Sequence, residues 1–162
     1  MVSARAVAET VTDPELPMVT LAELGVLREV TEGPGRVEVT ITPTYTGCPA
    51  LDAMRDDLRN RLAEAGYAEV RIRTVLDPPW TTDWISGPGR RKLAAAGVSP
   101  PGPAPRRASG PIPLALGPTR RVACPRCGSA DTVELSRFGS TACKSLRRCD
   151  ACHEPFEHFK EI

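Results

Sequence analysis

The stretch RVEVTITPTYTGCPALDAMRDDLRNRLAEAG, from Arg36 to Gly66, decides the fold of the first part of the chain. Its first nine residues alternate between apolar and polar types, which predicts a half-buried strand. The apolar positions are Val37, Val39 and Ile41. From Pro49 onward the apolar residues recur at helical spacing as far as Gly66, a residue type that often follows a helix. The pattern predicts a strand that leads, through a short loop containing Cys48, into an amphipathic helix.

The segments on either side complete a small domain. SARAVAETV predicts a short helix that ends at Asp13-Pro14, a strand is expected over 26–31, and EGPGR is typical of a hairpin turn. EVRIRTVLD, from Glu69, predicts a third strand. A weak last helix is expected in PPWTTDWISGPGRRKLAAAG, interrupted at Gly87-Pro88-Gly89. The order α-β-β-α-β-α over residues 1–97 predicts an α+β fold, a small domain of two layers.

Composition places limits on the function. The chain has 162 residues, of which 41% are hydrophobic and 25% charged, and a formal net charge of +1. A balance this close to neutral gives no electrostatic reason to expect binding to nucleic acid or to a membrane surface. No apolar run approaches the roughly 20 residues that span a bilayer, and the first residues lack the apolar core of a signal peptide. We therefore expect a cytoplasmic protein, in which cysteines are more often ligands or reactive thiols than disulfides.

The rest of the chain predicts a linker and a metal-binding module. Residues 98–121 are rich in proline and favour an extended linker, whereas residues 122–162 hold five of the six cysteines. The spacing of Cys124-x-x-Cys127 and Cys149-x-x-Cys152 is typical of a β zinc ribbon with four thiolate ligands. A redox dithiol or an iron–sulfur site on the same four cysteines are the alternatives. Cys143 does not fit the pairing; a packed residue, an alternative ligand and a second reactive thiol all remain open for it.

Cys48 is the one cysteine outside the tail. Because Pro49 suits the first position of a helix, Cys48 is expected near the N-cap, where free N–H groups favour a thiolate. Such a thiolate is a nucleophile or a metal ligand. The alternative is a small buried hydrophobic residue, which free cysteines often are. A cysteine hydrolase is disfavoured because both histidines lie in the distant tail.

Three motifs carry a resemblance to a known family: Asp13-Pro14-Glu15, Thr44 with Cys48-Pro49, and Pro78-Pro79-Trp80. Over residues 5–97 the chain resembles the family that contains the bacterial iron–sulfur assembly protein SufT. With its tail, including FGSTACK and EPF, the chain resembles the PaaD-like accessory proteins of the phenylacetyl-coenzyme A epoxidase system. The resemblance implies a role in phenylacetate catabolism, with Cys48 handling iron or an iron–sulfur cluster and Asp13, Glu15 and Thr44 as possible neighbours.

We therefore expect a maturation factor rather than an enzyme. It would use structural zinc and transiently bound iron or an iron–sulfur cluster, and its partners would be the epoxidase components, above all the [2Fe-2S] reductase, with a homodimer as a possibility. Trp80 and Trp84 would dock the partner or, alternatively, cover the sheet. The rival hypotheses are a structural component of the oxygenase without metal transfer, and a thiol redox enzyme using Cys124/Cys127 or Cys48/Cys143. Sequence signatures of a di-iron, flavin or ferredoxin-type catalytic component are missing.

Overall fold

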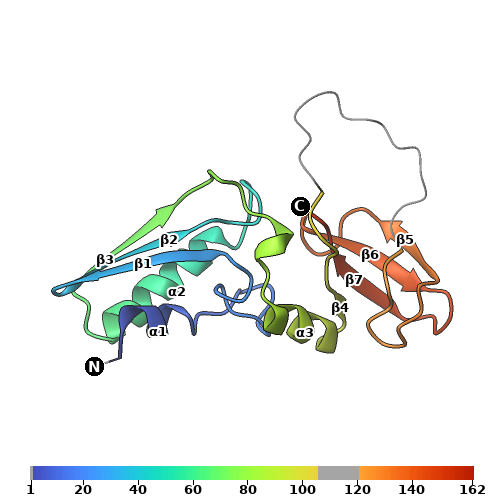
Figure 1. Ribbon diagram of the computed structural model, residues 1–162, viewed down its shortest axis with the longest axis horizontal. Helices are drawn as coiled ribbons and strands as arrows, with labels where there is room; N and C mark the ends of the chain where they lie inside the picture. Colours follow the sequence, from blue (N-terminus) through green and yellow to red (C-terminus); the bar gives the residue numbers. More distant parts are fainter. Residues whose placement is uncertain (1, 106–120) are drawn as a thin grey trace. The chain divides into compact units, whose positions relative to one another are not determined.

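The computed structural model describes residues 2–105 and 121–162, and the chain divides into two compact units, Met1–Lys92 and Leu93–Ile162 (Figure 1). The sequence places its boundary after Gly97, slightly later than this division. Most of the predicted linker, residues 106–120, lies outside the described residues. Within the described parts, no helix combines the length and the apolar character that crossing a bilayer requires.

The first unit has the predicted order of elements. It consists of α1 (Ala4–Ala8), β1 (Leu27–Gly33), β2 (Arg36–Ile41), α2 (Leu51–Glu64), β3 (Glu69–Thr74), a 3-10 turn (Thr82–Trp84) and the first part of α3 (Gly87–Ala95). The sheet order is β1-β2-β3, antiparallel between β1 and β2 and parallel between β2 and β3. Helices α1 and α2 lie on one face of this sheet (Figure 1). The α+β prediction is confirmed.

The core of the first unit lies between the sheet and α2. The alternating residues of β2, Val37, Val39 and Ile41, are at most 2% exposed. The helix contributes Met54, Leu58 and Leu62, which are equally buried. Helix α2 ends where predicted, and Gly66 follows it with a φ of +98°, a conformation that side chains with a Cβ disfavour.

Two helix starts differ from the sequence prediction. Helix α2 begins at Leu51, two residues later than Pro49. Helix α3 begins at Gly87 and is not interrupted by Gly87-Pro88-Gly89. The Ser86 side chain accepts a hydrogen bond from the Gly89 N–H, and Pro88 lies in the first turn, where it needs no donor. Gly89 also approaches the Glu23 carbonyl so closely that a Cβ would lie 2.9 Å from its oxygen.

The second unit is a four-stranded sheet in the order β4-β7-β6-β5. Its strands are β4 (Val98–Ser99), β5 (Thr132–Ser136), β6 (Lys144–Cys149) and β7 (Pro155–Phe159). The two predicted ribbon strands correspond to β5 and β6, while β4 and β7 were not anticipated. Strand β4 lies in the segment predicted as linker, which is a correction: Val98–Ser99 pair in parallel with β7 and belong to the ribbon sheet.

Candidate functional site

Four cysteine sulfurs converge in the second unit. The Sγ atoms of Cys124, Cys127, Cys149 and Cys152 all lie within 4.8 Å of one another. Cys124 and Cys152 are 3.7 Å apart, and Cys127 and Cys149 are 3.6 Å apart, too far for disulfides. A tetrahedral ion with metal–sulfur bonds of about 2.3 Å would hold its ligands about 3.8 Å apart. The spacing therefore fits one four-coordinate metal ion.

The two CxxC turns share a backbone device. In the first turn, the Gly128 N–H donates to the Cys124 carbonyl at 2.9 Å, and Gly128 has a φ of +75°. In the second, the residue directly after Cys152 is His153, with a φ of +62°. A left-handed residue after the second cysteine bends the chain so that both thiols of a turn point the same way. His153 is thus a turn residue that occupies the position of a glycine.

The electrostatics of the metal-free cluster favour a bound cation. The Cys152 N–H, with that of Ala151, hydrogen bonds to the Cys149 sulfur and lowers its pKa to about 7. At Cys152 a backbone N–H from Glu154 favours the thiolate, yet burial and the three neighbouring sulfurs raise its pKa to about 12. Thiolates this close oppose one another's ionisation. All four can be charged together only if a cation lies between them, which the structural metal of a ribbon supplies.

A small core and an ion pair support the four ligands. Val122 and Phe156 pack against Cys124 and Cys149, which are 2% and 0% exposed. The guanidinium of Arg126, inside the first CxxC turn, pairs with the carboxylate of Glu154, just after the second. The ion pair ties one turn to the other across the site, so their spacing is held by the protein as well as by a metal.

Cys143 is separate from this cluster. Among the described residues, the group of sulfurs that could share a metal comprises the four ribbon cysteines without Cys143. Cys143 is 7% exposed and its sulfur lies 3.0 Å from the Thr141 hydroxyl. Its carbonyl accepts the Lys160 N–H. Of the three interpretations open from the sequence, this geometry favours a packed residue.

Cys48 lies in the loop between β2 and α2, half-buried and in no disulfide. The N-cap of α2 is Ala50, so Cys48 is two residues further from the helix than predicted. Its carbonyl accepts the Leu51 N–H at 3.3 Å, so it satisfies a helix N–H with its backbone. The support that the helix dipole gives to a thiolate falls off over this distance. The loop follows the carboxyl end of β2, beside that of the parallel strand β3.

The predicted neighbours of Cys48 have structural roles of their own. The Asp13 carboxylate is 6% exposed and accepts hydrogen bonds from the N–H groups of Glu15 and Leu16, so it caps a turn. The Glu15 side chain is exposed, and Thr44 is half-buried in the Cys48 loop. The alternative of capping, which the sequence also left open for Asp13, describes its observed contacts.

The two tryptophans differ in accessibility. Trp80 is 2% exposed, and its indole N–H donates to the Leu24 carbonyl at 3.0 Å. A side chain so buried offers no surface to a partner, so Trp80 is a packing residue. Trp84 is half-buried, with the Arg28 guanidinium 3.6 Å from the centre of its ring. The backbone of Gly25, with a φ of +73°, approaches Trp84 so closely that a Cβ there would lie 2.5 Å from the Trp84 Cβ.

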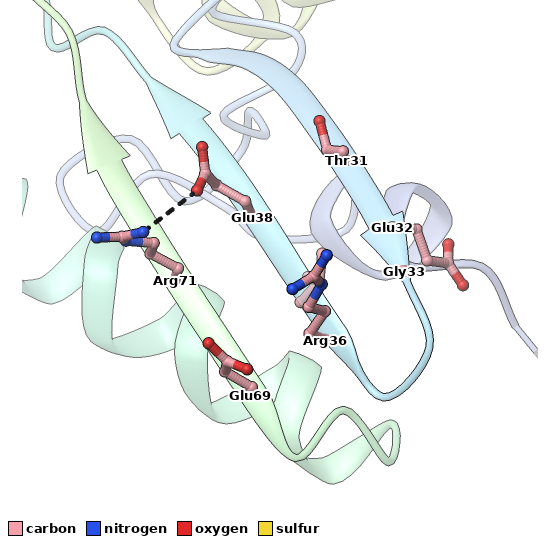
Figure 2. A pocket seen from close by; sticks show the side chains of 8 residues that line it. Thr31, Glu32, Gly33, Arg36, Glu38, Glu69 and Arg71 are labelled. Atoms are coloured by element: carbon pink, nitrogen blue, oxygen red, sulfur yellow. Dashed lines mark ion pairs between the residues drawn. The ribbon is translucent and has the colours of Figure 1, made fainter.

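The sheet face away from the helices carries charged and polar side chains of mixed sign. A shallow hollow of about 340 Å³ lies on it, lined by Thr31, Arg36, Glu38, Glu69 and Arg71 among others (Figure 2). Figure 2 shows Glu38 between strands, paired with Arg71, and a second ion pair joins Glu38 to Arg73 at 3.1 Å. Alternating charges that neutralise one another are typical of a solvated surface, and this hollow has no single ligand chemistry.

Sequence reasoning missed the Arg126–Glu154 ion pair and the turn role of His153. Both depend on two CxxC turns lying side by side, which the spacing predicts only as a common metal site. The equivalent positions of Gly128 and His153, each directly after a second cysteine, were the one signal available in the sequence.

Comparisons with known proteins match both units. Residues 4–74 match the family described as iron–sulfur cluster assembly protein, and residues 108–160 match the PaaD zinc beta ribbon domain. A protein of Escherichia coli strain K12, named for the 1,2-phenylacetyl-CoA epoxidase and as one of its subunits, is 43% identical over 97% of this chain and 90% of its own length.

Two further similarities concern the first unit. A Porphyromonas gingivalis protein named Fe-S protein maturation auxiliary factor is 38% identical over 48% of this chain and 74% of its own length. A crystal structure of a domain of unknown function, DUF59, from Bacillus anthracis has a TM-score of 0.52 and 29% identity, and the similarity covers 56% of this chain and 87% of that one. The fold of the first unit is therefore shared with DUF59 domains.

Proposed function

The chain belongs to the PaaD family, and we propose that it is a maturation factor that assists the insertion of iron or an iron–sulfur cluster into components of the phenylacetyl-CoA epoxidase system. A broader accessory role in iron–sulfur assembly is supported by the names of its relatives, among them an Fe–S protein maturation auxiliary factor. We assign the protein no reaction of its own: it handles a cargo that other proteins make and use.

The observation that carries this proposal is the division of labour among the cysteines. Four of them form one closed set of ligands in the second unit. Cys48 lies in the other unit, half-buried on a loop of the domain that matches the iron–sulfur assembly family. A four-thiolate site holds its metal firmly, whereas a single thiolate binds a cargo loosely enough to release it. We therefore assign transfer to Cys48 and structure to the ribbon.

The resident metal of the ribbon is, in this proposal, zinc. Zinc prefers four thiolates in a tetrahedral arrangement, and the family description names a zinc ribbon. The ion would neutralise the ionised sulfurs of Cys124, Cys127, Cys149 and Cys152 and keep the two turns together. The residues of the chain do the rest: Val122 and Phe156 close one side of the site, and Arg126 and Glu154 fix the spacing of the turns.

The cargo at Cys48 needs ligands from elsewhere, because one thiolate fills one coordination position. We propose that the rest come from the cargo's own sulfides, from the client, or from Cys48 of a second copy in a homodimer. The client we propose is an epoxidase component, the [2Fe-2S] reductase first among them. Six cysteines without a disulfide suit a reducing compartment such as the cytoplasm.

The test compares wild type with Cys48→Ala, purified without oxygen. Metal, acid-labile sulfide and the visible spectrum are measured before and after an iron–sulfur cluster is offered. We expect about one zinc per chain in both proteins, as one four-thiolate site requires, and iron with sulfide only in the wild type. Equal uptake by both proteins, or none by either, contradicts transfer through Cys48. Cys143→Ala is the matched control, because it removes a thiol of the same type from outside both proposed sites.

A second candidate function is a structural component of the epoxidase complex without metal transfer. The name of the Escherichia coli relative favours it, because that name counts the relative among the subunits of the epoxidase. Under this alternative Cys48→Ala supports epoxidase assembly and activity as well as the wild type does, and the chain co-purifies with the oxygenase in fixed proportion. Under the maturation proposal the variant yields an epoxidase that lacks its metal centres, and the chain is absent from the finished complex.

A further inference from the structure

The exposed apolar side chains of the described residues gather at one place. Six large hydrophobic side chains are exposed, and three of them fall within six residues of one another, on β5 and in the turn that follows it. Val133, Leu135 and Phe138 are 39%, 51% and 66% exposed. We call these three residues the hairpin patch. The other exposed residues, Val2, Leu76 and Ile162, are far from one another in the sequence.

The turn that carries the patch is anchored by a buried ion pair. The Lys144 ammonium, only 4% exposed, lies 2.7 Å from the Glu157 carboxylate. The other carboxylate oxygen of Glu157 accepts the Ser140 N–H at 2.8 Å. The Gly139 N–H donates to the Lys144 carbonyl, and a Cβ on Gly139 would lie 2.7 Å from the same carboxylate. These contacts fix the turn in a conformation in which Phe138 remains exposed.

Phe138 is held in place while it remains exposed. Its N–H donates to the Ser136 hydroxyl at 3.2 Å, and the Lys160 ammonium lies 4.8 Å from the centre of its ring. The same ammonium donates to the Arg137 carbonyl at 3.0 Å. An aromatic side chain already ordered before binding loses little conformational entropy on contact, which is the property of an interface anchor.

The charges around the patch indicate what it would contact. Within the described residues neither Arg137 nor Lys160 has an ion pair with a carboxylate, although carboxylates neutralise most cations of the ribbon. The patch is thus apolar at its centre and cationic beside Phe138. The open sheet face of the first unit, whose arginines pair with Glu38, lacks this combination (Figure 2).

We propose that the hairpin patch is a docking surface for a partner protein that offers an apolar pocket bordered by carboxylates. Phe138 fills the pocket, Leu135 and Val133 extend the contact along β5, and Arg137 and Lys160 face the carboxylates. This inference rests on the proposed function in one respect: the partner is taken to be a component of the epoxidase system. The surface itself lies on the ribbon unit and does not involve Cys48.

The experiment measures binding of the purified, metal-loaded full-length chain to each purified epoxidase component by biolayer interferometry. Phe138→Ala and Arg137→Glu are compared with wild type, and Leu76→Ala is the matched control, since it removes an exposed apolar side chain of the other unit. We expect each patch variant to weaken binding about tenfold or more, as loss of an interface anchor does, and the control to bind within twofold of wild type. The effect of Arg137→Glu should shrink in high salt.

Any of three results overturns the proposal. The first is that Phe138→Ala binds every component as tightly as wild type does, and the second is that wild type binds none of them at micromolar concentration. The third is a wild-type dimer in sedimentation that Phe138→Ala converts to a monomer, which would make the patch a contact between copies of this chain.

Cys48→Ala separates this proposal from the proposed function. That variant should dock on the epoxidase component normally while failing to take up the cluster, and Phe138→Ala should do the reverse. Docking that survives Phe138→Ala counts against the patch alone, whereas cluster uptake that survives Cys48→Ala counts against transfer alone. The two measurements therefore identify which of the two proposals is wrong.

Discussion

Removing the ribbon metal should unfold the second unit and leave the first intact. The described apolar side chains buried in the second unit, cysteines aside, are Leu93, Val98, Val122, Phe156 and Phe159. Fully burying five such side chains contributes about 8–15 kcal/mol before any ordering cost, at about 1.5–3 kcal/mol each. A structural zinc ion contributes about 10–16 kcal/mol, as much as the whole net stability of a typical domain, about 5–15 kcal/mol. Chelation therefore removes more than the unit can lose.

Hydrogen exchange followed by mass spectrometry measures this directly on the full chain. After a chelator has removed the metal, amides of β5, β6 and β7 should exchange at the rate of an unfolded chain. Amides of β1, β2, β3 and α2 should keep their protection, because the first unit has its own core and contributes no ribbon ligand. Restoring zinc should restore protection. If β6 stays protected in protein shown by metal analysis to be metal-free, the reasoning that the metal supplies the folding free energy is refuted.

Three further predictions concern single side chains of the ribbon. Glu157→Ala should destabilise the second unit by about 3–5 kcal/mol in chemical denaturation, because it leaves the Lys144 ammonium buried without its carboxylate. His153→Gly should stabilise the unit by up to about 1 kcal/mol, since a residue with a Cβ pays to adopt the left-handed conformation that Gly128 adopts in the other turn. Burial lowers the pKa of His158, so acid favours the unfolded state, and His158→Gln should lose less stability than wild type as the pH falls below about 6.5.

Each of these has its own control. For Glu157, the exposed pair between Arg148 and Asp150 serves, because Asp150→Ala should cost less than about 1 kcal/mol. For His153, a variant less stable than wild type would show that its side chain contributes more than its backbone costs. For His158, protonation is favoured in the unfolded chain below its ordinary pKa and resisted in the folded one, so stability is lost as pH falls. Identical acid dependence in wild type and variant contradicts the buried, neutral imidazole.

Local patterns in the sequence predicted what local physics determines. The alternation of Val37, Val39 and Ile41 and the helical spacing of Leu58 and Leu62 each reflect one face turned to a core, and the structure has both. The four ribbon cysteines were predictable for a similar reason, because tetrahedral thiolate coordination requires two pairs at short spacing.

Contacts between distant segments were beyond those patterns. Trp80 is buried because Leu24, far away in the chain, provides a carbonyl acceptor for its indole N–H. The start of α2 moved past Pro49 because the Cys48 carbonyl satisfies the Leu51 N–H. Strand β4, only two residues long, is ordered by its pairing with β7, and nothing in Val98–Ser99 alone predicts it.

The pairing of β4 changes the meaning of the proline-rich segment. The Ser99 hydroxyl donates to the Ala123 carbonyl at 3.0 Å, so the chain on either side of residues 106–120 is fastened within the same unit. The polypeptide that connects the two units is α3, which contains residues on both sides of the division. A protease cut within 106–120 would therefore leave two fragments held together by the ribbon sheet, and insertions there would lengthen a closed loop without lengthening the connection between units.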